Sequence, residues 1–478
     1  MTPDRPLRIA LVSREYPPFF GGGIGSYARH IAPALARAGV HVHVLTQAHD
    51  PSHPRVTSSA LGAGSLTVHR VPLPSRTGSW TRSLLRWSAA VATALDDLRR
   101  EQRIDLAEFA ECEAAGLTTS LARAMFPELD ASPGLSASAP TRLPTVVHLH
   151  TPSEMLLALR SLSISSVTED FAAYVLAERA AMHAASAICA PSRFIAGWAQ
   201  KHYELSTTPE VIPYAIAPPP PLESLGEFPE APRVLFVGRI EPRKGIEPLL
   251  RAWARVRAAV PGAELRIAGS DTSTAPGGTS LRGHLVRDLS IDARGSIQFL
   301  GPLPPEVLTL EYAQASLCVI PSLWENYPNT CLEALAHARP VVVSDSGGMR
   351  EMFEGTPAGL TFPTGCVESL ADAMISILHE PPAQRQARGL AGREHIAALC
   401  DPARIAARRI DFYRRVIERD QASPDRATEP GQALRMWRSL QTLASGQTWG
   451  VAMPTVEPAI ARWLGGTDSP ARTHECAI

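Results

Sequence analysis

Two cations in the second half of the chain have the spacing to hold an anionic group. Arg239 and Lys244 stand in the segment GRIEPRKG, which directly follows the apolar run VLFV of a predicted strand. Lys244 is one of only two lysines among 46 basic residues, the other being Lys201. Fixed cations at the carboxyl end of a strand suit an anion, and above all a diphosphate. A solvated loop is the alternative for this pair taken alone.

Two carboxylates flank a predicted helix start in the segment ENYPNTCLEA. Asn329 is expected to cap a helix that begins at Thr330, and the backbone N–H groups of that first turn would form an anion site. Glu325 lies in the loop before the helix, and Glu333 lies one turn inside it. One carboxylate could accept hydrogen bonds from sugar hydroxyls and the other from a ribose. Complementation of the helix dipole is the alternative for a single glutamate, but the two nearby cations argue against it.

A glycine-rich loop near the N-terminus, YPPFFGGGIG, could approach a phosphate or a sugar closely. It runs from Tyr16 to Gly25 and includes Gly22 and Gly23. The glycines begin eight residues after the strand predicted to end at Ser13, and the next strand ends without an acidic residue. Both features argue against a dinucleotide fingerprint. A flexible structural loop is the alternative. Tyr16, at the start of the loop, is a candidate for binding a second substrate that would accept a transferred group.

Histidines and glutamates in the first half of the chain follow predicted strands. In HLHT, His148 and His150 point to the same face, and His150 lies nearer the strand end and is the preferred candidate. A buried core histidine is the alternative for His148. Glu108, Glu111 and Glu113 are expected to follow a strand end, where they could bind acceptor hydroxyls. A solvated acidic turn is the alternative for these three.

The elements that must position these residues alternate between strand and helix, which is typical of parallel βαβ units. In the first half we predict strands over 7–13, 40–46, 67–71, 104–109, 145–150 and 187–190, with helices over 24–38, 80–100, 117–124 and 172–184. In the second half we predict strands over 234–237, 265–268, 297–299, 317–320 and 341–344, with helices over 246–260, 330–337, 370–379 and 402–419.

This pattern predicts an α/β protein of two tandem, doubly wound, Rossmann-like domains that face each other across a cleft. Residues 1–216 form the N-terminal, acceptor-side domain, and the Pro-rich segment 217–232 forms a linker. Residues 233–400 form the C-terminal, ligand-binding domain, and residues 401–420 form a helix that returns to the first domain. Residues 421–478 are an additional tail whose role the sequence does not reveal.

Composition excludes several classes of protein. The chain has 478 residues, 45% of them hydrophobic, and a formal net charge of −1, so a nucleic-acid partner is not expected. No run of 18 apolar residues and no N-terminal apolar segment is present, and the seven cysteines form no C-x-x-C. We therefore expect reduced thiols and a cytoplasmic location.

Taken together, the order PP-x-x-GG-x₄-Y, H-T, G-R-x₄-K-G, E-x₇-E and P-V-V-x-S-D-x-G-G resembles the family 4 retaining glycosyltransferases of the GT-B fold, also called glycosyl transferases group 1. The resemblance covers about residues 7–415. It implies that Arg239 and Lys244 hold a donor diphosphate, to which Asn329 and Thr330 offer backbone N–H groups. These residues would stabilise the charge left when the bond to the sugar breaks.

The resemblance also assigns the other candidates. Glu325 would contact the transferred sugar, Glu333 the nucleotide ribose, and the Gly22–Gly23 loop the donor phosphates. His150 would face the sugar near the reaction centre. The implied catalytic residues are therefore His150, Glu325, Arg239 and Lys244. No D-x-D motif occurs in the sequence, so we expect neither a metal nor another cofactor.

The expected function is transfer of a hexose-type sugar, with retention, from a UDP- or GDP-linked donor to a sugar, glycan or lipid-linked acceptor, as in bacterial polysaccharide biosynthesis. The alternatives are a nucleotide-sugar epimerase or a phosphorylase of the same fold, and an inactive sugar-nucleotide-binding or partner-recruiting module. Trp80, Leu84, Trp87 and Val91 form an apolar stripe that could contact the inner face of a membrane, but packing on the sheet is the favoured interpretation.

Overall fold

The computed structural model describes residues 5–19, 22–73, 79–125, 143–158, 168–221, 223 and 231–422. These residues form two compact units. The first unit combines the described residues up to Ala217 with those from Pro402 onward, and the second spans Pro218–Asp401. Half of the predicted linker and nearly all of the predicted tail, residues 423–478, lie outside the described ranges.

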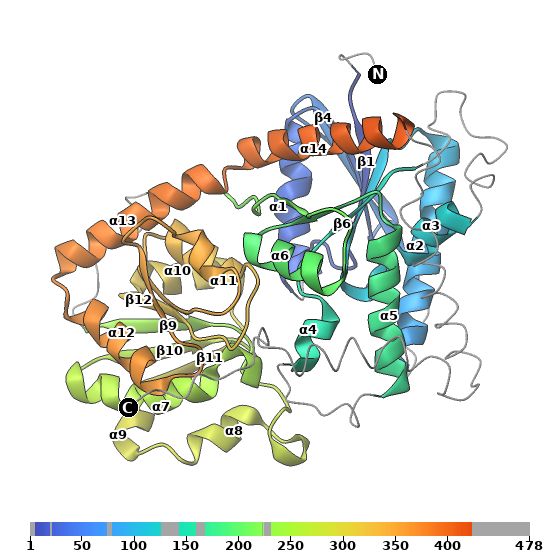
Figure 1. The fold of residues 1–478 in the computed structure, drawn as a ribbon. Helices are drawn as coiled ribbons and strands as arrows, with labels where there is room; N and C mark the ends of the chain where they lie inside the picture. Colours follow the sequence, from blue (N-terminus) through green and yellow to red (C-terminus); the bar gives the residue numbers. More distant parts are fainter. Residues whose placement is uncertain are drawn as a thin grey trace. The chain divides into compact units, whose positions relative to one another are not determined.

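The first unit is built on an eight-stranded sheet of order β3-β4-β2-β1-β5-β6-β7-β8 (Figure 1). β3 is antiparallel to β4, and the other neighbouring strands are parallel. The strands are β1 (Arg8–Val12), β2 (His41–Gln47), β3 (Val56–Leu61), β4 (Gly64–Val71), β5 (Leu106–Ala110), β6 (Thr145–His148), β7 (Ala187–Ala190) and β8 (Glu210–Val211).

Helices pack around this sheet in two groups. α2, α3 and α5 contact one another, and α14, from the far end of the sequence, packs along α1 (Figure 1). Hydroxyl side chains start three of the helices, since Ser79, Thr168 and Ser192 each accept a hydrogen bond from a backbone N–H of the first turn. The helices are α1 (Gly23–Arg37), α2 (Trp80–Glu101), α3 (Leu117–Met125), α4 (Ser153–Ala158), α5 (Glu169–Ala184), α6 (Arg193–His202) and α14 (Pro402–Ala422), with the 3₁₀ turn η1 (Cys112–Ala114).

The second unit is built on a six-stranded parallel sheet of order β11-β10-β9-β12-β13-β14. Its strands are β9 (Arg233–Val237), β10 (Glu264–Ala268), β11 (Ile297–Gly301), β12 (Leu317–Ile320), β13 (Val341–Ser344) and β14 (Gly359–Phe362). Its helices are α7 (Ile246–Ala259), α8 (Leu281–Val286), α9 (Ile291–Gly295), α10 (Pro305–Gln314), α11 (Asn329–Ala336), α12 (Val367–His379) and α13 (Pro382–Leu399), with the 3₁₀ turns η5 (Pro242–Lys244), η6 (Pro276–Gly278) and η7 (Met349–Met352).

Apolar runs form the buried strands of this unit. Val234 and Phe236 of β9, Val342 of β13 and the inward faces of α7 and α12 form its hydrophobic core, around the fully buried Trp253. α7 packs against α12, and α11 packs against α13. The prediction of two doubly wound α/β domains is therefore confirmed.

Both sheets reverse their strand order at one place, and that place is where open α/β sheets bind ligands. In the first unit the reversal lies between β1 and β5, and in the second it lies between β9 and β12. Crevices at such points form outside the carboxyl ends of the strands. The segments that follow β1, β5, β9 and β12 are therefore the first places to look for a site.

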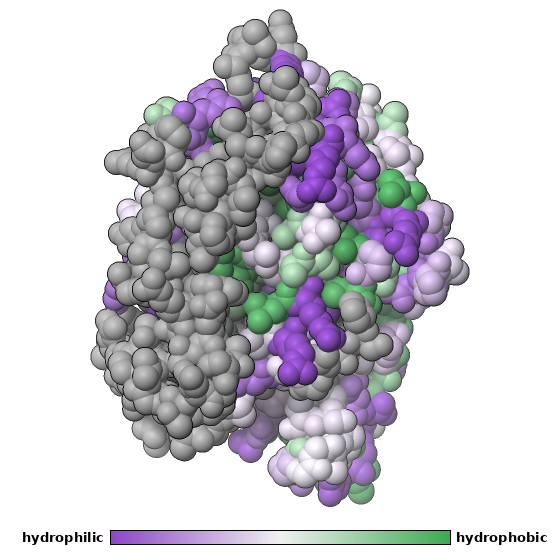
Figure 2. Space-filling model, turned by 90° about the vertical axis from the view of Figure 1, so that its right-hand side faces the viewer, coloured by the Kyte–Doolittle hydropathy of each residue, from purple (hydrophilic) through white to green (hydrophobic). Residues whose placement is uncertain are grey.

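The apolar stripe of α2 belongs to the core. Leu84, Trp87 and Val91 are at most 1% exposed and join two hydrophobic clusters, while Trp80 at the start of the helix is 64% exposed. Figure 2 looks onto the side of the molecule where α2, α3 and α5 lie, and shows a small hydrophobic group flanked by strongly hydrophilic residues. The packing interpretation is confirmed. Within the described ranges, no helix has the length and apolar character to cross a membrane.

Several predicted strand ends are wrong, and some elements were not predicted. β5 extends to Ala110 rather than ending at Phe109, and β6 ends at His148 rather than His150. β3 was missed because its sequence VTSSAL is polar and mostly exposed, without the alternation of a half-buried strand. α13 was missed because it begins with Pro-Pro and its apolar residues are mainly alanine and glycine.

Candidate active site

Two loops of the second unit are locked together at the point where its strand order reverses. The loop after β9 contains Gly245 with φ +69°, where an added Cβ would lie 1.8 Å from the carbonyl oxygen of Pro321. The loop after β12 returns the contact, since the Leu323 N–H donates to the Arg243 carbonyl oxygen at 2.8 Å. Only glycine suits this close approach at a left-handed φ. The K-G pair in the sequence thus brings Lys244 next to the loop that carries Glu325.

Charged side chains from these two loops form one connected cluster. Lys244 Nζ and Arg243 Nη1 both contact the same oxygen of Glu325, Oε1, the arginine at 2.9 Å. Arg243 Nη2 also binds Glu241 at 3.0 Å. Arg239 binds the other oxygen of Glu241 at 3.2 Å, and its side chain remains 60% exposed. The structure therefore brings the predicted Arg239, Lys244 and Glu325 into one cluster, which we call the cation cluster together with Arg243 and Glu241.

Glu325 is ionised in this setting. Its side chain is 7% exposed, and burial alone would raise its pKa. Lys244 and Arg243 outweigh that effect and hold the pKa of Glu325 below its usual value. Burial likewise opposes the charge on Arg243, but Glu325 and Glu241 raise its pKa above the usual value. Glu325 and Arg243 therefore form an ion pair whose two members are both charged at neutral pH.

The backbone of Glu325 is fixed from a third direction by the loop after β13. Gly347 has φ +74°, and a Cβ there would lie 1.7 Å from the Glu325 carbonyl oxygen. The Gly348 N–H donates to the carbonyl oxygens of Glu325 and Asn326, at 3.3 and 3.0 Å. Gly347 is thus required by the close packing of this loop, and Gly348 contributes its backbone N–H. Their role is to place Glu325, since they approach its backbone.

Helix α11 begins one residue earlier than predicted. Pro328 is its N-cap residue and Asn329 is the first helical residue, so the prediction that Asn329 caps the helix is wrong. Proline at this point already sets a backbone angle suited to a helix start. Asn329 and Thr330 nevertheless occupy the first turn, whose backbone N–H groups have no partner within a helix. A partial positive charge therefore develops at this end of α11.

Glu333 is held separately from the cation cluster. The Tyr312 hydroxyl on α10 donates to Glu333 Oε2 at 2.9 Å, and its ring stacks on that of His337 at 5.1 Å between centroids. Tyr312 is buried, and burial together with Glu333 raises its pKa well above the usual value. It therefore stays neutral and remains a donor. Tyr312 and Arg243 are two residues that the sequence analysis missed.

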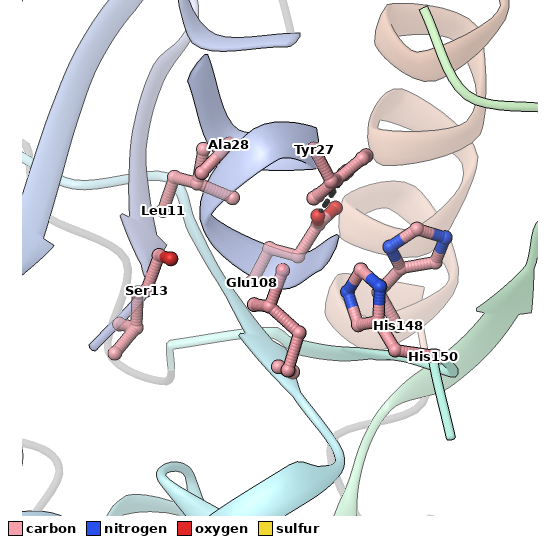
Figure 3. A pocket seen from close by; sticks show the side chains of 10 residues that line it. Leu11, Ser13, Tyr27, Ala28, Glu108, His148 and His150 are labelled. Carbon is pink, nitrogen blue, oxygen red and sulfur yellow. Dashed lines mark hydrogen bonds between the residues drawn. The ribbon is translucent and has the colours of Figure 1, made fainter. Parts of the chain in front are cut away.

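The first unit has a narrow pocket at its own strand reversal, after β1 and beside β5 and β6 (Figure 3). Its empty volume is about 190 Å³, and no water-sized sphere fits inside it. The lining residues are Leu11, Val12, Ser13, Ile24, Tyr27, Ala28, Glu108, Ala110, His148 and His150. As it stands, the pocket is too narrow to hold a sugar.

The two histidines of this pocket lie against each other, with ring centroids 4.5 Å apart. His150 is 5% exposed, and its Nδ1 lies 2.8 Å from the Tyr214 hydroxyl. Burial and the nearby Arg409 lower the pKa of His150 to about 3, so its ring is neutral at neutral pH. His150 can therefore exchange hydrogen bonds with a ligand but cannot serve as a cation.

Glu108 occupies a different place from the one predicted. It lies within β5, is 1% exposed, and does not follow the strand end. Its carboxylate accepts hydrogen bonds from Tyr27 at 2.6 Å, from Arg409 at 2.7 Å and from Tyr413 at 2.5 Å. Arg409 and Tyr413 belong to α14, so this carboxylate anchors the last described helix to the sheet. The predicted role of Glu108 in binding an acceptor has no accessible oxygen to support it.

Arg409 also determines the protonation of His148. Its Nη2 lies 3.1 Å from His148 Nε2, and because arginine has no acceptor, that nitrogen must accept the hydrogen bond. A neutral His148 then carries its proton on Nδ1. Burial and Arg409 lower the pKa of His148 well below its usual value, which agrees with the neutral ring. The interpretation of His148 as a core histidine is thus consistent with its contacts.

Glu111 lies just after β5 and is fully buried. Its Oε1 accepts a hydrogen bond from the Thr151 N–H, while Oε2 has no partner among the described residues. Burial raises the pKa of Glu111 to about 7. Nearby Glu178 is also buried, and its pKa is raised well above the usual value by burial and by Glu111. Burial therefore favours the neutral form of both carboxyl groups.

We expect the change Glu111→Gln to make the protein more stable at pH 8 than the unchanged chain, but not at pH 4. The neutral carboxyl stabilises the folded state fully below about pH 4.5, and this contribution is lost as pH rises through about 7. At pH 8 the free energy of unfolding of Glu111→Gln should exceed that of the unchanged chain by at most about 3 kcal/mol. Urea unfolding at both pH values measures it, with Glu113→Gln as the control. Equal effects of Glu111→Gln at both pH values would contradict the interpretation.

The remaining predicted residues lie near the start of α1. Tyr16 is 7% exposed, and burial raises its pKa to about 12. Gly22 is the N-cap of α1 and Gly23 its first residue. Glu15 lies close to both ends of this turn, since its carboxylate is 3.8 Å from a Cβ built on Gly22 and 3.5 Å from one built on Gly25. The structure thus places the described glycines at a helix start, where backbone N–H groups are available.

Sequence comparisons identify both halves of the chain. Residues 22–215 match the family described as glycosyl transferase 4-like domain, and residues 231–380 match glycosyl transferases group 1. A glycogen synthase of Mycobacterium tuberculosis is 27% identical over 438 residues, covering 85% of this chain and 94% of that protein. A D-inositol 3-phosphate glycosyltransferase of Kribbella flavida is 26% identical over 428 residues, covering 82% and 92%.

The fold is likewise shared with solved structures. Sucrose-phosphate synthase from Thermosynechococcus elongatus superposes with a TM-score of 0.66 at 22% identity, covering 86% of this chain and 99% of that one. Two α/β units, each with charged residues where the strand order of its sheet reverses, are typical of the GT-B class, whose fold this chain shares. The chain belongs to the family 4 type of glycosyltransferases, glycosyl transferases group 1.

Proposed function

We propose that this glycosyltransferase moves a hexose-type sugar, with retention of configuration, from a nucleotide-linked donor to a carbohydrate hydroxyl. The cation cluster at the β9–β12 reversal is the observation that carries the proposal. It presents Lys244 beside an ionised Glu325, and Arg239 joins the same cluster through Glu241. A UDP or GDP sugar has a diphosphate that matches the two cations and a sugar ring whose hydroxyls match the carboxylate.

The cluster would act mainly by electrostatics. When the bond between sugar and nucleotide breaks, negative charge develops on the diphosphate. Arg239 and Lys244 would stabilise that charge, together with the backbone N–H groups at Asn329 and Thr330. These charges are fixed before the reaction, so little reorganisation is needed at the moment of bond cleavage. The proposal therefore assigns the stabilising role to these groups and includes no metal ion.

Two carboxylates would select the donor. Glu325 would accept a hydrogen bond from a hydroxyl of the transferred sugar, and Glu333 from a ribose hydroxyl. Glu333 is already oriented by the Tyr312 hydroxyl, which donates to its Oε2 at 2.9 Å. His150 is neutral at neutral pH and is kept as a candidate for hydrogen-bonding a ligand hydroxyl. Acceptors named for the relatives include an inositol phosphate, which supports a polyol or sugar hydroxyl here.

Donor binding is expected to raise the melting temperature of the chain. A ligand at a hundred times its Kd adds about 2.7 kcal/mol to stability. The panel is UDP, GDP, ADP and their hexose conjugates, each with and without EDTA, and the shift should be independent of the chelator. The unchanged chain should respond to one nucleotide sugar most strongly, and Glu325→Ala should respond less. A chain that responds to none of them would contradict the proposal.

Product analysis separates this activity from the alternatives of the same fold. An epimerase would change the donor sugar in the absence of any acceptor, whereas the proposed transferase requires an acceptor for more than slow hydrolysis. An inactive binding module would show the thermal shift without turnover. The best donor is incubated alone and with glucose, inositol phosphate or a glucan. Following both the identity of the donor sugar and the release of nucleoside diphosphate distinguishes the three outcomes.

A further inference from the structure

Arg243 occupies a central place in the cation cluster that the G-R-x₄-K-G pattern does not assign. Its guanidinium makes contacts in three directions: to Glu325 Oε1 at 2.9 Å, to the Trp324 carbonyl oxygen at 3.3 Å and to Glu241 at 3.0 Å. Its side chain is 20% exposed, against 60% for Arg239. Such a group is held too firmly to follow a ligand, unlike a flexible lysine.

The two oxygens of Glu325 have different surroundings. Oε1 is contacted by both Lys244 and Arg243, whereas Oε2 has no hydrogen-bond or ion-pair partner among the described residues. A carboxylate held by one oxygen presents the other in a fixed direction. Oε2 is therefore the oxygen that is available to accept a hydrogen bond from a ligand hydroxyl.

Lys244 and Arg243 compete for the same oxygen, which matters once a ligand enters. If Lys244 turns to a phosphate, Glu325 loses one of its two cations, and an ionised carboxylate that is 7% exposed requires another partner. Arg243 supplies that partner without moving, because Glu241 and the Trp324 carbonyl oxygen hold it in place. The loop backbone reinforces this, since the Arg243 carbonyl oxygen accepts the Leu323 N–H at 2.8 Å.

We propose that Arg243 is a positioning residue that fixes Glu325 through Oε1, so that Oε2 recognises a hydroxyl of the donor sugar while Lys244 is released to the diphosphate. This inference rests on the proposed function and deepens it, because it assigns sugar recognition and phosphate binding to separate cations. Arg243 itself touches neither the sugar nor the phosphate. Its effect should therefore appear in the preference for the sugar, not in binding of the nucleotide.

The test compares two dissociation constants for each protein, that of the nucleoside diphosphate alone and that of its hexose conjugate. We expect Arg243→Gln to bind UDP, GDP or ADP as tightly as the unchanged chain does. Its preference for the hexose conjugate over the nucleoside diphosphate, the ratio of the two dissociation constants, should fall about tenfold. Arg243→Lys keeps the charge but cannot make all three contacts. Its preference for the conjugate should therefore lie between that of the unchanged chain and that of Arg243→Gln. Arg251→Gln is the matched control, since Arg251 lies on α7 with a 69% exposed side chain.

The pH profile gives a second readout that simple destabilisation would not change. Without Arg243, Glu325 keeps Lys244 as the cation that lowers its pKa, and burial opposes that effect. The acidic limb of kcat/KM should therefore move upward by about one pH unit in Arg243→Gln and stay in place in Arg243→Lys. If Arg243→Gln does not fold, the test uses Arg243→Lys. A reduced preference of that variant for the conjugate supports the inference, and an unchanged preference overturns it.

Two failures can be told apart. If the unchanged chain binds none of the nucleotide sugars, the proposed function is wrong and this inference falls with it. If the unchanged chain binds one of them, and the Arg243 variants keep both its sugar preference and its acidic limb, the inference alone is wrong. Equal weakening of nucleotide and conjugate would also overturn it, because that result would place Arg243 on the phosphate.

Discussion

Replacing Lys244 with methionine is expected to lower the rate of sugar transfer about 10²- to 10³-fold while leaving the chain folded. The ammonium group is a fixed cation beside the place where the diphosphate would leave, and methionine preserves most of the length of the side chain without the charge. Glu325 keeps Arg243 at 2.9 Å, so its carboxylate is not left unpaired. The loss should therefore fall on the reaction rather than on stability.

The measurement is the release of nucleoside diphosphate from the best donor at saturating acceptor, as kcat and kcat/KM. Lys201→Met is a convenient control because Lys201 is the other lysine of the chain and lies on α6 of the first unit. Lys244→Arg should recover part of the rate, since it restores charge with a different shape. A Lys244→Met variant within a few-fold of the unchanged rate would remove Lys244 from the mechanism.

Replacing Arg409 with methionine is expected to destabilise the first unit by about 3–5 kcal/mol. Arg409 is fully buried and pairs with Glu108 at 2.7 Å, and its removal leaves a buried carboxylate with only two tyrosine donors. It also removes the hydrogen bond to His148, whose ring lies against His150. Both stability and the order of the pocket should suffer.

The double variant Glu108→Gln with Arg409→Met separates charge from packing. Because it leaves no unpaired buried charge, it should recover at least half of the stability lost in Arg409→Met. The midpoint of urea unfolding measures each variant, and Arg415→Met, which removes an exposed pair with Glu210, is the control. If the double variant is no more stable than Arg409→Met, the buried ion pair does not explain the effect.

Much of the fold could be predicted because its strands are short apolar runs separated by helical repeats. Leu317–Ile320, Val341–Ser344 and Ala187–Ala190 were predicted to the residue, since each is bounded by polar or turn residues. β5 was predicted to end at Phe109, one residue before its observed end at Ala110, and the predicted strand already contained the charged Glu108. A charged residue inside a strand becomes acceptable only when a distant partner arrives, and here that partner is Arg409, 301 positions away.

The candidate site was predictable to the extent that it follows strand ends. Glycine and lysine after β9 and glutamate after β12 meet because the two strands are neighbours at the reversal, which their sequence order alone does not reveal. Arg243 could not be distinguished from a spacer within GRIEPRKG, since its importance depends on the carbonyl of Trp324 and on Glu325. Tyr312 likewise carried no signal, because its partner Glu333 lies on another helix.

The central claim is that Lys244 belongs to a nucleotide-sugar site. Because the chain has two lysines, a label on lysine tests this claim directly. A chain labelled with ¹³C at the lysine Cε gives two side-chain signals, one from Lys201 and one from Lys244, and Lys244→Arg assigns them. Saturating the chain with the nucleotide hexose that gives the largest thermal shift should move the Lys244 signal and leave that of Lys201 in place. If the ligand binds while the Lys244 signal stays unchanged, or if only Lys201 responds, the proposed donor site is in the wrong place.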